Sequence, residues 1–536
     1  MAERWSAPGL CSVVSYALLV ALVNGAGAAK ILVVPVDGSH WVNIKILMME
    51  LIARGHECTV LRPSNAIYIE DVSDSFYIET VQLQEQHTLS REQLEKHFLE
   101  YVFKTAFSQK TSQLSIAWEF FKAQKEATKS SVIVLQSTFD NKELMKRLED
   151  ARFDLVLADP YYAGGVMLAH YLKIPVVFFG RWMPTEDIHF ATAPSPLSYV
   201  PVLNSRVTDK MRFTERFENV FLYSMNRVLS HFFIYPTYDE LCHRYLKTDF
   251  GLYDLYKKAD IYLMKVDFVF EFPRPIMPNA IYIGGFQCRP PKALPAEIQE
   301  FMDSSGDAGV VVFSLGTLVR TLPRDKANKI AAAFARLPER VIWRYTGETP
   351  PTLGNNTKTL SWLPQNDILS HPKTRAFIAH GGENGVYEAL YHGVPVIGFP
   401  LFGDQYENLL RLQSRGAAFL LENLSDFTAD DIYTAVRTVI DEPSYRVNMQ
   451  RLSALHRDVE AHPMQTAIFW TEYTMRHKGA SHLQAVGNDL PFYQYYLLDV
   501  IGLLGGILFL FFFLALKLLR AVVKRACSGK MKKKRE

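Results

Sequence analysis

Cysteine is scarce in this 536-residue sequence, and none of the five cysteines belongs to a C-x-x-C pair. They are Cys11, Cys58, Cys242, Cys288 and Cys527. Without such pairs, neither a disulfide framework nor a zinc site is expected. The motifs H-E-x-x-H and D-x-D are also missing, so the sequence predicts no metal site.

An excess of charge of one sign is lacking as well, because 58 basic and 56 acidic residues give a formal net charge of +2. This balance excludes a strongly basic surface, and no nucleic-acid partner is expected. Hydrophobic residues make up 49% of the chain, which suits a globular protein with some membrane-inserted sequence. Because 536 residues exceed the size of one hydrophobic core, two folded domains are expected.

The N-terminus has the layout of a cleavable secretory signal. Arg4 precedes an apolar stretch at residues 13–23, and the small residues 26–29 follow it. We therefore expect a signal peptide over residues 1–29 and a mature chain that starts near Lys30. A retained anchor is the alternative, which the short apolar core disfavours.

A second apolar run, residues 500–516, contains no charge and is long enough to cross a bilayer. It predicts a transmembrane helix over residues 497–519. The tail, residues 520–536, is basic, so the positive-inside rule puts it in the cytoplasm and nearly all the rest in the lumen. Its Lys533 and Lys534 resemble a dilysine retrieval signal bound by a coat protein; a solvated charge run is the alternative.

Between these ends, strand and helix patterns alternate. A buried strand at residues 30–36 leads through a turn to a helix at 42–54, and further strand–helix units follow. The proline-bearing stretch 289–295 is typical of a linker, and a second β-α series comes after it. The sequence thus predicts an α/β fold of two doubly wound domains. The expected bounds of the domains and of the juxtamembrane segment are residues 30–285, 286–480 and 481–496.

In open α/β sheets, ligands bind at the carboxyl ends of the strands, so polar residues at these ends are candidates. The first strand ends in Asp37-Gly38-Ser39-His40, and a later one ends in Asp159-Pro160. Two strands of the second series end in Ser314-Leu315-Gly316-Thr317 and His380-Gly381-Gly382. A nicotinamide oxidoreductase would need G-x-G-x-x-G after the first strand, so that function is set aside.

The densest signal lies within residues 362–405. A strand ends at His380, glycines let the backbone approach a ligand, and a helix begins near Glu383. The free amides at the start of this helix can bind a diphosphate.

Other residues of the same stretch suit the rest of a nucleotide sugar. Trp362 offers a flat face to a planar base, and Glu388 can accept hydrogen bonds from ribose hydroxyls. Asp404 and Gln405 can bind sugar hydroxyls. Together they predict a nucleotide-sugar site, while each alone has an ordinary structural reading, such as a core Trp or a helix cap.

This stretch resembles the signature of the UDP-glycosyltransferases, specifically the vertebrate UDP-glucuronosyltransferases. The likeness covers nearly all of the chain. Its other segments are Asp37-Gly38-Ser39-His40-Trp41, residues 153–160, 272–279, 312–316 and 476–480. The resemblance implies a GT-B fold, in which two Rossmann-like domains face each other across a cleft. The N-terminal domain then binds the acceptor, and the C-terminal domain binds the donor.

The resemblance also implies roles for individual residues. His40 matches the general base, and Asp159 matches the acid that orients it and stabilises its imidazolium form. Trp362 is expected to stack on uracil. The donor-binding residues are expected to be Ser314, Gly316, Thr317, Arg344, Trp362, Gln365, His380, Gly382, Asn384, Gly385, Glu388, Asp404 and Gln405.

The implied reaction is a direct displacement with inversion from α to β. UDP-glucuronate is the co-substrate, a small lipophilic molecule is the acceptor, and neither a metal nor another cofactor is expected. The resemblance further implies an endoplasmic-reticulum membrane protein that forms homo- or hetero-oligomers.

Two residues depart from the family pattern. Glu383 occupies a position that usually holds a small residue, next to the expected diphosphate, and we expect it to point to solvent. Lys265 stands where related enzymes often carry an Arg near the donor carboxylate, and an ammonium group provides no bidentate clamp.

Two other functions remain open. A transferase of the same fold could use another UDP-hexose (glucose, galactose or N-acetylglucosamine), because Asp404 and Gln405 suit any hexose. A non-catalytic lumenal lipid-binding protein could retain the fold, although an intact His40 and Asp159 argue against it.

Three features outside these motifs concern the lumenal surface and the acceptor. Asn355 and Asn423 stand in N-x-S/T triplets and are candidate glycosylation sites. Residues 64–150 are expected to be mostly helical. Their many aromatic side chains can form an apolar acceptor pocket or ordinary core.

Overall fold

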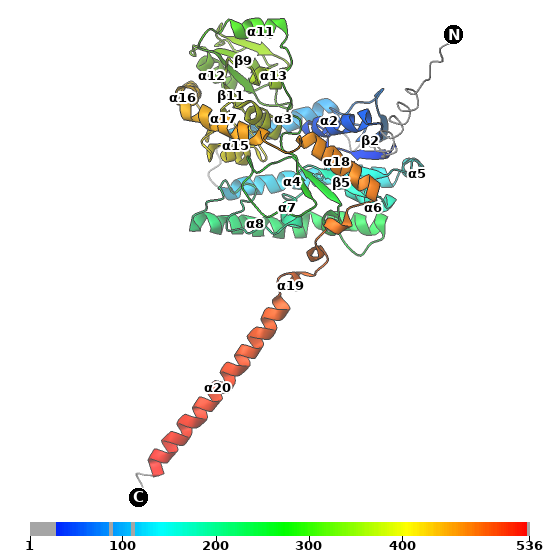
Figure 1. Cartoon of the computed structure of the whole chain (residues 1–536), viewed down its shortest axis with the longest axis vertical. Coiled ribbons are helices and arrows are strands. Elements are labelled where there is room, and N and C mark those ends of the chain that lie inside the picture. Colours follow the sequence, from blue (N-terminus) through cyan, green and yellow to red (C-terminus); the bar gives the residue numbers. More distant parts are fainter. Residues whose placement is uncertain (1–27, 85–88, 109–112, 533–536) are drawn as a thin grey trace, which may run out of the picture. The chain divides into compact units, whose positions relative to one another are not determined.

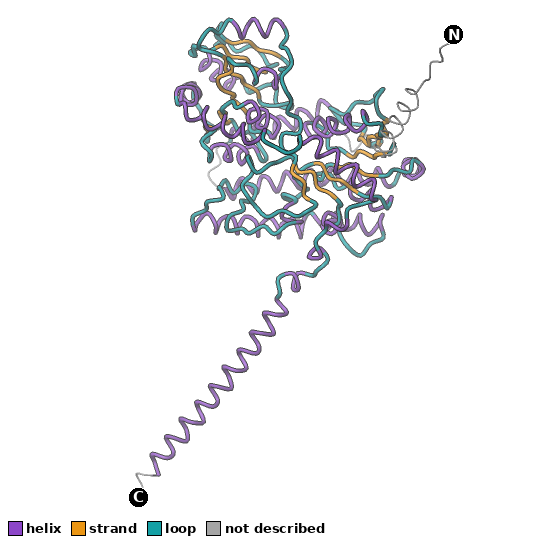
Figure 2. The backbone as a smooth tube through the Cα atoms, viewed as in Figure 1, coloured by secondary structure: helices purple, strands orange, loops and turns teal. Residues whose placement is uncertain are grey.

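The computed structural model describes residues 28–84, 89–108 and 113–532, with side chains up to residue 526. The expected signal peptide lies almost wholly outside these ranges, as do Lys533 and Lys534. The chain forms two compact units that divide between Leu483 and Gln484. Figure 1 labels their elements, and Figure 2 colours the same backbone by secondary structure.

The first unit contains a seven-stranded parallel sheet in the order β3-β2-β1-β4-β5-β6-β7. Its central strands are almost entirely buried, as expected for Val- and Leu-rich strands covered by helices on both faces. The strands are β1 (Lys30–Val34), β2 (Glu57–Pro63), β3 (Tyr77–Val81), β4 (Leu155–Ala158), β5 (Val176–Phe179), β6 (Ile261–Met264) and β7 (Ala280–Tyr282).

Helices connect these strands, and the longest lie in the connections after β3 and β5. The sequence pattern missed β3, an edge strand that pairs with β2 in a stretch expected to be mostly helical. The helices are α2 (Ser39–Ala53), α3 (Arg91–Phe107), α4 (Gln113–Phe139), α5 (Lys142–Asp150), α6 (Gly164–Leu172), α7 (His189–Thr192), α8 (Phe213–Phe233), α9 (Tyr235–Leu241), the π-helical turn η2 (Cys242–Leu246) and α10 (Leu252–Lys257).

A second parallel sheet of six strands follows in the same unit, in the order β10-β9-β8-β11-β12-β13. The strands are β8 (Val310–Ser314), β9 (Arg340–Arg344), β10 (Thr357–Leu360), β11 (Thr374–Ala379), β12 (Val396–Gly398) and β13 (Ala418–Leu420). The helices are α11 (Ala296–Asp303), α12 (Arg324–Phe334), α13 (Gln365–Leu369), α14 (Glu383–His392), α15 (Gln405–Gln413), α16 (Ala429–Asp441), α17 (Pro443–Arg457) and α18 (Pro463–His477), followed by the 3₁₀ turn η3 (Ser481–Leu483).

Each sheet receives a helix from the other half of the sequence. Helix α18 packs on α2 and β6, and its Ala467 and Ile468 belong to the core around β1. Conversely, Val102 of α3 is fully buried in the core built on the second sheet, and the rings of Phe98 and Phe402 meet edge-on at 5.4 Å. These exchanged helices join the two halves into one unit.

The second unit consists of η4 (Val486–Asn488), α19 (Phe492–Tyr495) and α20 (Leu498–Lys532). The span Leu498–Ala526 has a mean hydropathy of 2.5 and is long and apolar enough to cross a membrane, as expected. The helix continues past the expected end at residue 519 into the basic tail.

Candidate active site

The two predicted catalytic residues meet where the order of the first sheet reverses. Strands β1 and β4 are neighbours but lead to connections on opposite sides, which leaves a crevice at their carboxyl ends. Gly38, at a φ of 87°, turns the chain from β1 directly into α2, so His40 lies in the first turn of this helix rather than in a loop. Asp159 directly follows β4.

His40 and Asp159 form a hydrogen bond of 2.6 Å between Nδ1 and Oδ2. Asp159 is buried and its Oδ1 accepts from the backbone N–H of Tyr161, so the carboxylate is fixed at both oxygens. The His40 side chain is 33% exposed. A ring that donates from Nδ1 to a carboxylate keeps the lone pair of Nε2, which is the arrangement of a general base.

The second sheet reverses its order between β8 and β11, and a second crevice lies there. Ser314 ends β8, and its hydroxyl accepts from the N–H of Gly316 at 3.3 Å. A Cβ on Gly316 or Gly382 would lie 2.5 Å or less from the ring of His380, which follows β11, so glycine is needed at both positions.

His380 has the properties of a ligand-binding residue. Its Nδ1 is buried and bonds no other described residue. Burial lowers the pKa of His380 to about 4, so the ring is neutral at physiological pH. A neutral imidazole with an unused nitrogen can exchange a hydrogen bond with a bound group.

Helix α14 begins immediately after this crevice. Its N-terminal residues include the predicted Asn384, which is half-buried, and the buried Gly385. One turn later, Glu388 accepts a hydrogen bond from Gln365, the first residue of α13. Burial raises the pKa of Glu388 to about 7.

Trp362 lies apart from any core and is 64% exposed. The guanidinium of Arg344, at the end of β9, lies 5.0 Å from the centre of its ring. Arg344 also donates to the carbonyl groups of Gly316 and Ser361, which fixes its position. The structure therefore excludes the reading of Trp362 as a core residue and presents a flat, open aromatic face.

The side chains of Asp404 and Gln405, both expected to bind the sugar, form hydrogen bonds with different parts of the protein. Asp404 accepts from the indole N–H of Trp182, at 3.2 Å, and from Asn408. The side-chain oxygen Oε1 of Gln405 accepts from the backbone N–H groups of Leu401 and Phe402, so this side chain holds its own loop, while its amide N–H₂ bonds no other residue in the described part of the chain.

The two residues that depart from the family pattern form an ion pair with each other. Lys265 follows β6, and its Nζ lies 2.9 Å from Oε2 of Glu383 at the start of α14. The side chains are 9% and 17% exposed. Burial alone would lower the pKa of Lys265, but Glu383, Asp159 and Asp404 outweigh it and raise the pKa. The expectation that Glu383 points to solvent is therefore wrong.

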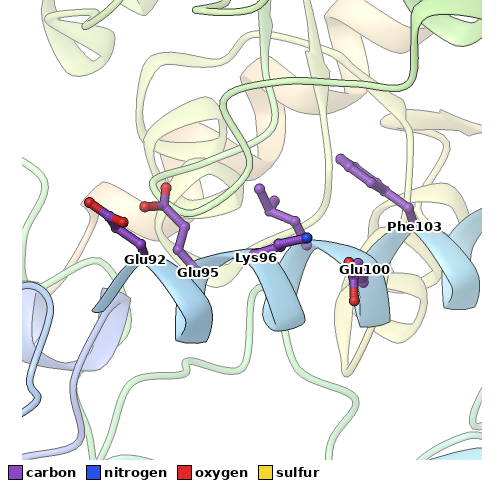
Figure 3. Close-up of a pocket in the computed structure, with 6 residues that line it drawn as sticks. Glu92, Glu95, Lys96, Glu100 and Phe103 are labelled. Carbon is purple, nitrogen blue, oxygen red and sulfur yellow. The ribbon is translucent and has the colours of Figure 1, made fainter. Parts of the chain in front are cut away.

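Two hollows lie away from these residues. Figure 3 shows one on α3, where acidic side chains gather on one face of the helix. Its lining residues are Glu92, Glu95, Lys96, Leu99, Glu100 and Phe103. A second hollow, between α4 and α8, is lined in part by Phe120, Phe121, Phe190, Leu222 and Tyr223. Three aromatic residues of the stretch 64–150 thus line a hollow, Phe103 the first and Phe120 and Phe121 the second, while Phe98 and Phe103 also pack against the core of the second sheet.

Comparison with known proteins identifies the family. The model of the family described as UDP-glucoronosyl and UDP-glucosyl transferase matches residues 29–534. The chain belongs to this transferase family.

Its curated relatives include UDP-glucuronosyltransferase 2C1 of Oryctolagus cuniculus, 42% identical over 503 residues, which are 93% of this chain and 99% of the relative. UDP-glucuronosyltransferase 2A2 of Homo sapiens is 41% identical over 490 residues, 89% of either chain. The calicheamicin glycosyltransferase CalG4 has a similar fold, with a TM-score of 0.55, 19% identity, and coverage of 84% of this chain and 99% of that chain. The predicted GT-B fold is confirmed.

In this member of the transferase family, the structure brings most of the predicted site residues to the carboxyl ends of the two sheets. Sequence reasoning did not find Trp182, although it follows the end of β5 and could have been found by the same strand-end rule. Asn355 and Asn423 are exposed and lie outside the site. Asn423 accepts hydrogen bonds from Ser425 within its own triplet.

We expect Lys265→Met to destabilise this transferase by about 3 kcal/mol, since it leaves three carboxylates without their shared cation. In a unit of this size, the midpoint of thermal unfolding then falls by roughly 3 °C. The double variant Lys265→Met/Glu383→Gln should recover part of this loss. As a control, Lys129→Met in the exposed Glu126–Lys129 pair should change stability by less than about 1 kcal/mol. If the loss of stability in the double variant equals the sum of the losses in the two single variants, Lys265 and Glu383 do not stabilise each other.

Proposed function

We propose that this glycosyltransferase moves glucuronic acid from UDP-glucuronate to a hydroxyl group of small lipophilic acceptors, giving β-glucuronides for elimination. The observation that carries the proposal is the hydrogen bond between His40 and Asp159 at one switch point, opposite a cradle for a nucleotide diphosphate at the other. Both relatives named above are UDP-glucuronosyltransferases, which supports the choice of donor.

In the proposed reaction, Nε2 of His40 takes the acceptor proton as the acceptor oxygen attacks the anomeric carbon. Asp159 holds the ring through Nδ1 and stabilises the imidazolium that forms. The bond from the anomeric carbon to UDP breaks on the opposite side, so the configuration inverts from α to β. The positive end of α14 and the neutral ring of His380 stabilise the departing diphosphate.

The donor lies on the second half in this proposal. Uracil stacks on Trp362 beside Arg344, and Glu388 with Gln365 binds the ribose. Ser314, Gly316, Thr317, His380, Gly382, Asn384 and Gly385 surround the diphosphate, while Asp404 and Gln405 face the transferred sugar. Lys265, which is paired with Glu383, lies near Asp404 and that sugar, and no metal or further cofactor takes part.

The proposed location is the endoplasmic-reticulum membrane, with one transmembrane helix, lumenal domains over residues 30–285 and 286–480, and a cytoplasmic tail. Coat proteins retrieve the protein through Lys533 and Lys534, and it assembles as a homo- or hetero-oligomer. Asn355 and Asn423 are exposed and suit glycosylation in the lumen.

A second candidate is transfer of an uncharged hexose. One observation favours it: Glu383 already neutralises Lys265, so this cation is not free for a glucuronate carboxylate. An assay that compares UDP-glucuronate with uncharged UDP-hexoses, described next, distinguishes the two candidate functions.

We expect the full chain in microsomes to conjugate a panel of phenols with UDP-glucuronate and not with UDP-glucose, UDP-galactose or UDP-N-acetylglucosamine. His40→Ala and Asp159→Asn should lower kcat by about 10²–10⁴, because the base or its orientation is lost. Their affinity for UDP should be unchanged, which controls for misfolding. Turnover with another donor would favour the second candidate, and no turnover with any donor would favour a non-catalytic lipid-binding protein.

The raised pKa of Glu388 predicts a pH-dependent affinity for UDP, because the ionised carboxylate, which predominates above about pH 7, accepts from ribose hydroxyls more strongly than the protonated acid does. Glu388→Gln resembles the protonated acid at every pH. If ionisation strengthens binding about tenfold, the ratio of the variant's Kd to the wild-type Kd, measured by calorimetry, should rise from about two at pH 6 to about nine at pH 8. Titration of UDP itself cancels in this ratio. A ratio that stays constant across this range would contradict the assignment of Glu388.

A further inference from the structure

Helix α8 turns its polar side chains inward. Asn219 is fully buried and bonds the backbone of Val202 and Val200 through both ends of its amide. Asn226 donates to the carbonyl of Thr185 at 2.9 Å, and Arg227 pairs with the buried Glu186 at 2.6 Å. These bonds fix the rotation of the helix about its axis.

The opposite side of α8 is largely apolar and open, and its exposed polar residues, Thr214, Ser224 and His231, are not permanently charged. None of the exposed residues of this fully described helix is Asp, Glu, Lys or Arg. The spacing of its large apolar residues puts them on one side of the helix. We call them the α8 face: Phe213 (75% exposed), Phe217 (68%), Val220 (44%), Phe221 (49%), Val228 (54%) and Phe232 (65%).

This pattern is the reverse of an ordinary surface helix, which buries its apolar side and exposes its polar side. A contiguous exposed apolar patch marks an interaction surface. At the C-terminal end of α8, Phe233 meets Phe121 of α4 at 6.1 Å, and Phe121 meets Trp118 at 5.5 Å. Trp118 is 47% exposed, and Trp is a residue favoured at membrane interfaces.

A partner that covers the α8 face has to be apolar, and it has to be close to the first unit in every copy of the protein. The chain carries its own membrane span, Leu498–Ala526. Only the tether of residues 484–497 separates the span from the first unit, and such a tether reaches at most about 50 Å when fully extended. A bilayer is therefore available to the first unit in every copy of the protein. Figure 1 shows α8 along one outer edge of that unit, with nothing from the same unit beyond it.

We propose that the α8 face lies in the interfacial layer of the bilayer that holds the chain's own transmembrane span. A helix with Phe and Val on one side and anchored polar groups on the other is suited to lie in the plane of the interface. Insertion depends on burial of the apolar side chains; of the nearby cations, Arg212 is paired with Glu215, and Arg216 lies 5.9 Å from the centre of the Phe213 ring. The first unit is then held to the membrane by two separate attachments.

The test uses the full chain with Cys527→Ser and one introduced cysteine, since Cys58, Cys242 and Cys288 are buried. Val228→Cys reports on the α8 face. Val447→Cys on α17 is the matched control, because both valines are on helices and are 54% and 60% exposed. Each variant is labelled with an environment-sensitive fluorophore and placed in lipid nanodiscs that hold a single copy.

The label at residue 228 should show a blue-shifted emission, quenching by nitroxide-labelled lipid and shielding from aqueous iodide, whereas the label at residue 447 should show none of these. Equal iodide access at both positions would overturn the proposal. Shielding at residue 228 that needs two copies per disc would also overturn it and would assign the face to a second copy of the chain. An unchanged midpoint of thermal unfolding in both variants shows that the labelled proteins are folded.

Discussion

The chemistry of this protein depends on a topological constraint: in each parallel sheet, the order of the strands reverses at one point. The reversal leaves a crevice that no crossover helix fills. In the first sheet it brings together His40 and Asp159, which are 119 positions apart in the sequence. In the second sheet it brings the glycine-rich ends of β8 and β11 around His380. Neither pair of segments would meet without this strand order.

Buried charges join the two halves so that the crevices face one another. Glu271 accepts from Arg181 of the first half and from Arg411 of the second. Burial alone would raise the pKa of Glu271, but these two guanidinium groups outweigh it and lower the pKa to about 2. Removing one partner of such a buried network leaves an uncompensated charge. The cleft geometry and the stability of the unit are therefore linked through the same side chains.

Most of the fold could be predicted from the sequence, because buried parallel strands and the helices between them leave strong periodic patterns. Four strands, β3, β6, β7 and β10, were missed; all are short, and β3, β7 and β10 lie at the edges of their sheets. Motifs at strand ends predicted which residues gather at the two crevices, but not the contacts across the cleft. The pair Lys265–Glu383 and the bond from Trp182 to Asp404 join residues more than a hundred positions apart, and no local pattern encodes such contacts.

The central claim is that His40 takes the proton of the acceptor, and its most direct test varies the acidity of the acceptor. Wild type and His40→Ala are compared by kcat/KM on substituted phenols, from unsubstituted phenol to nitrophenols that are largely ionised at the assay pH. The account predicts that the loss caused by the substitution is greatest for phenol and shrinks as the acceptor becomes ionised, since an ionised acceptor needs no base. An equal loss for every acceptor would contradict it and would give His40 a role other than proton transfer.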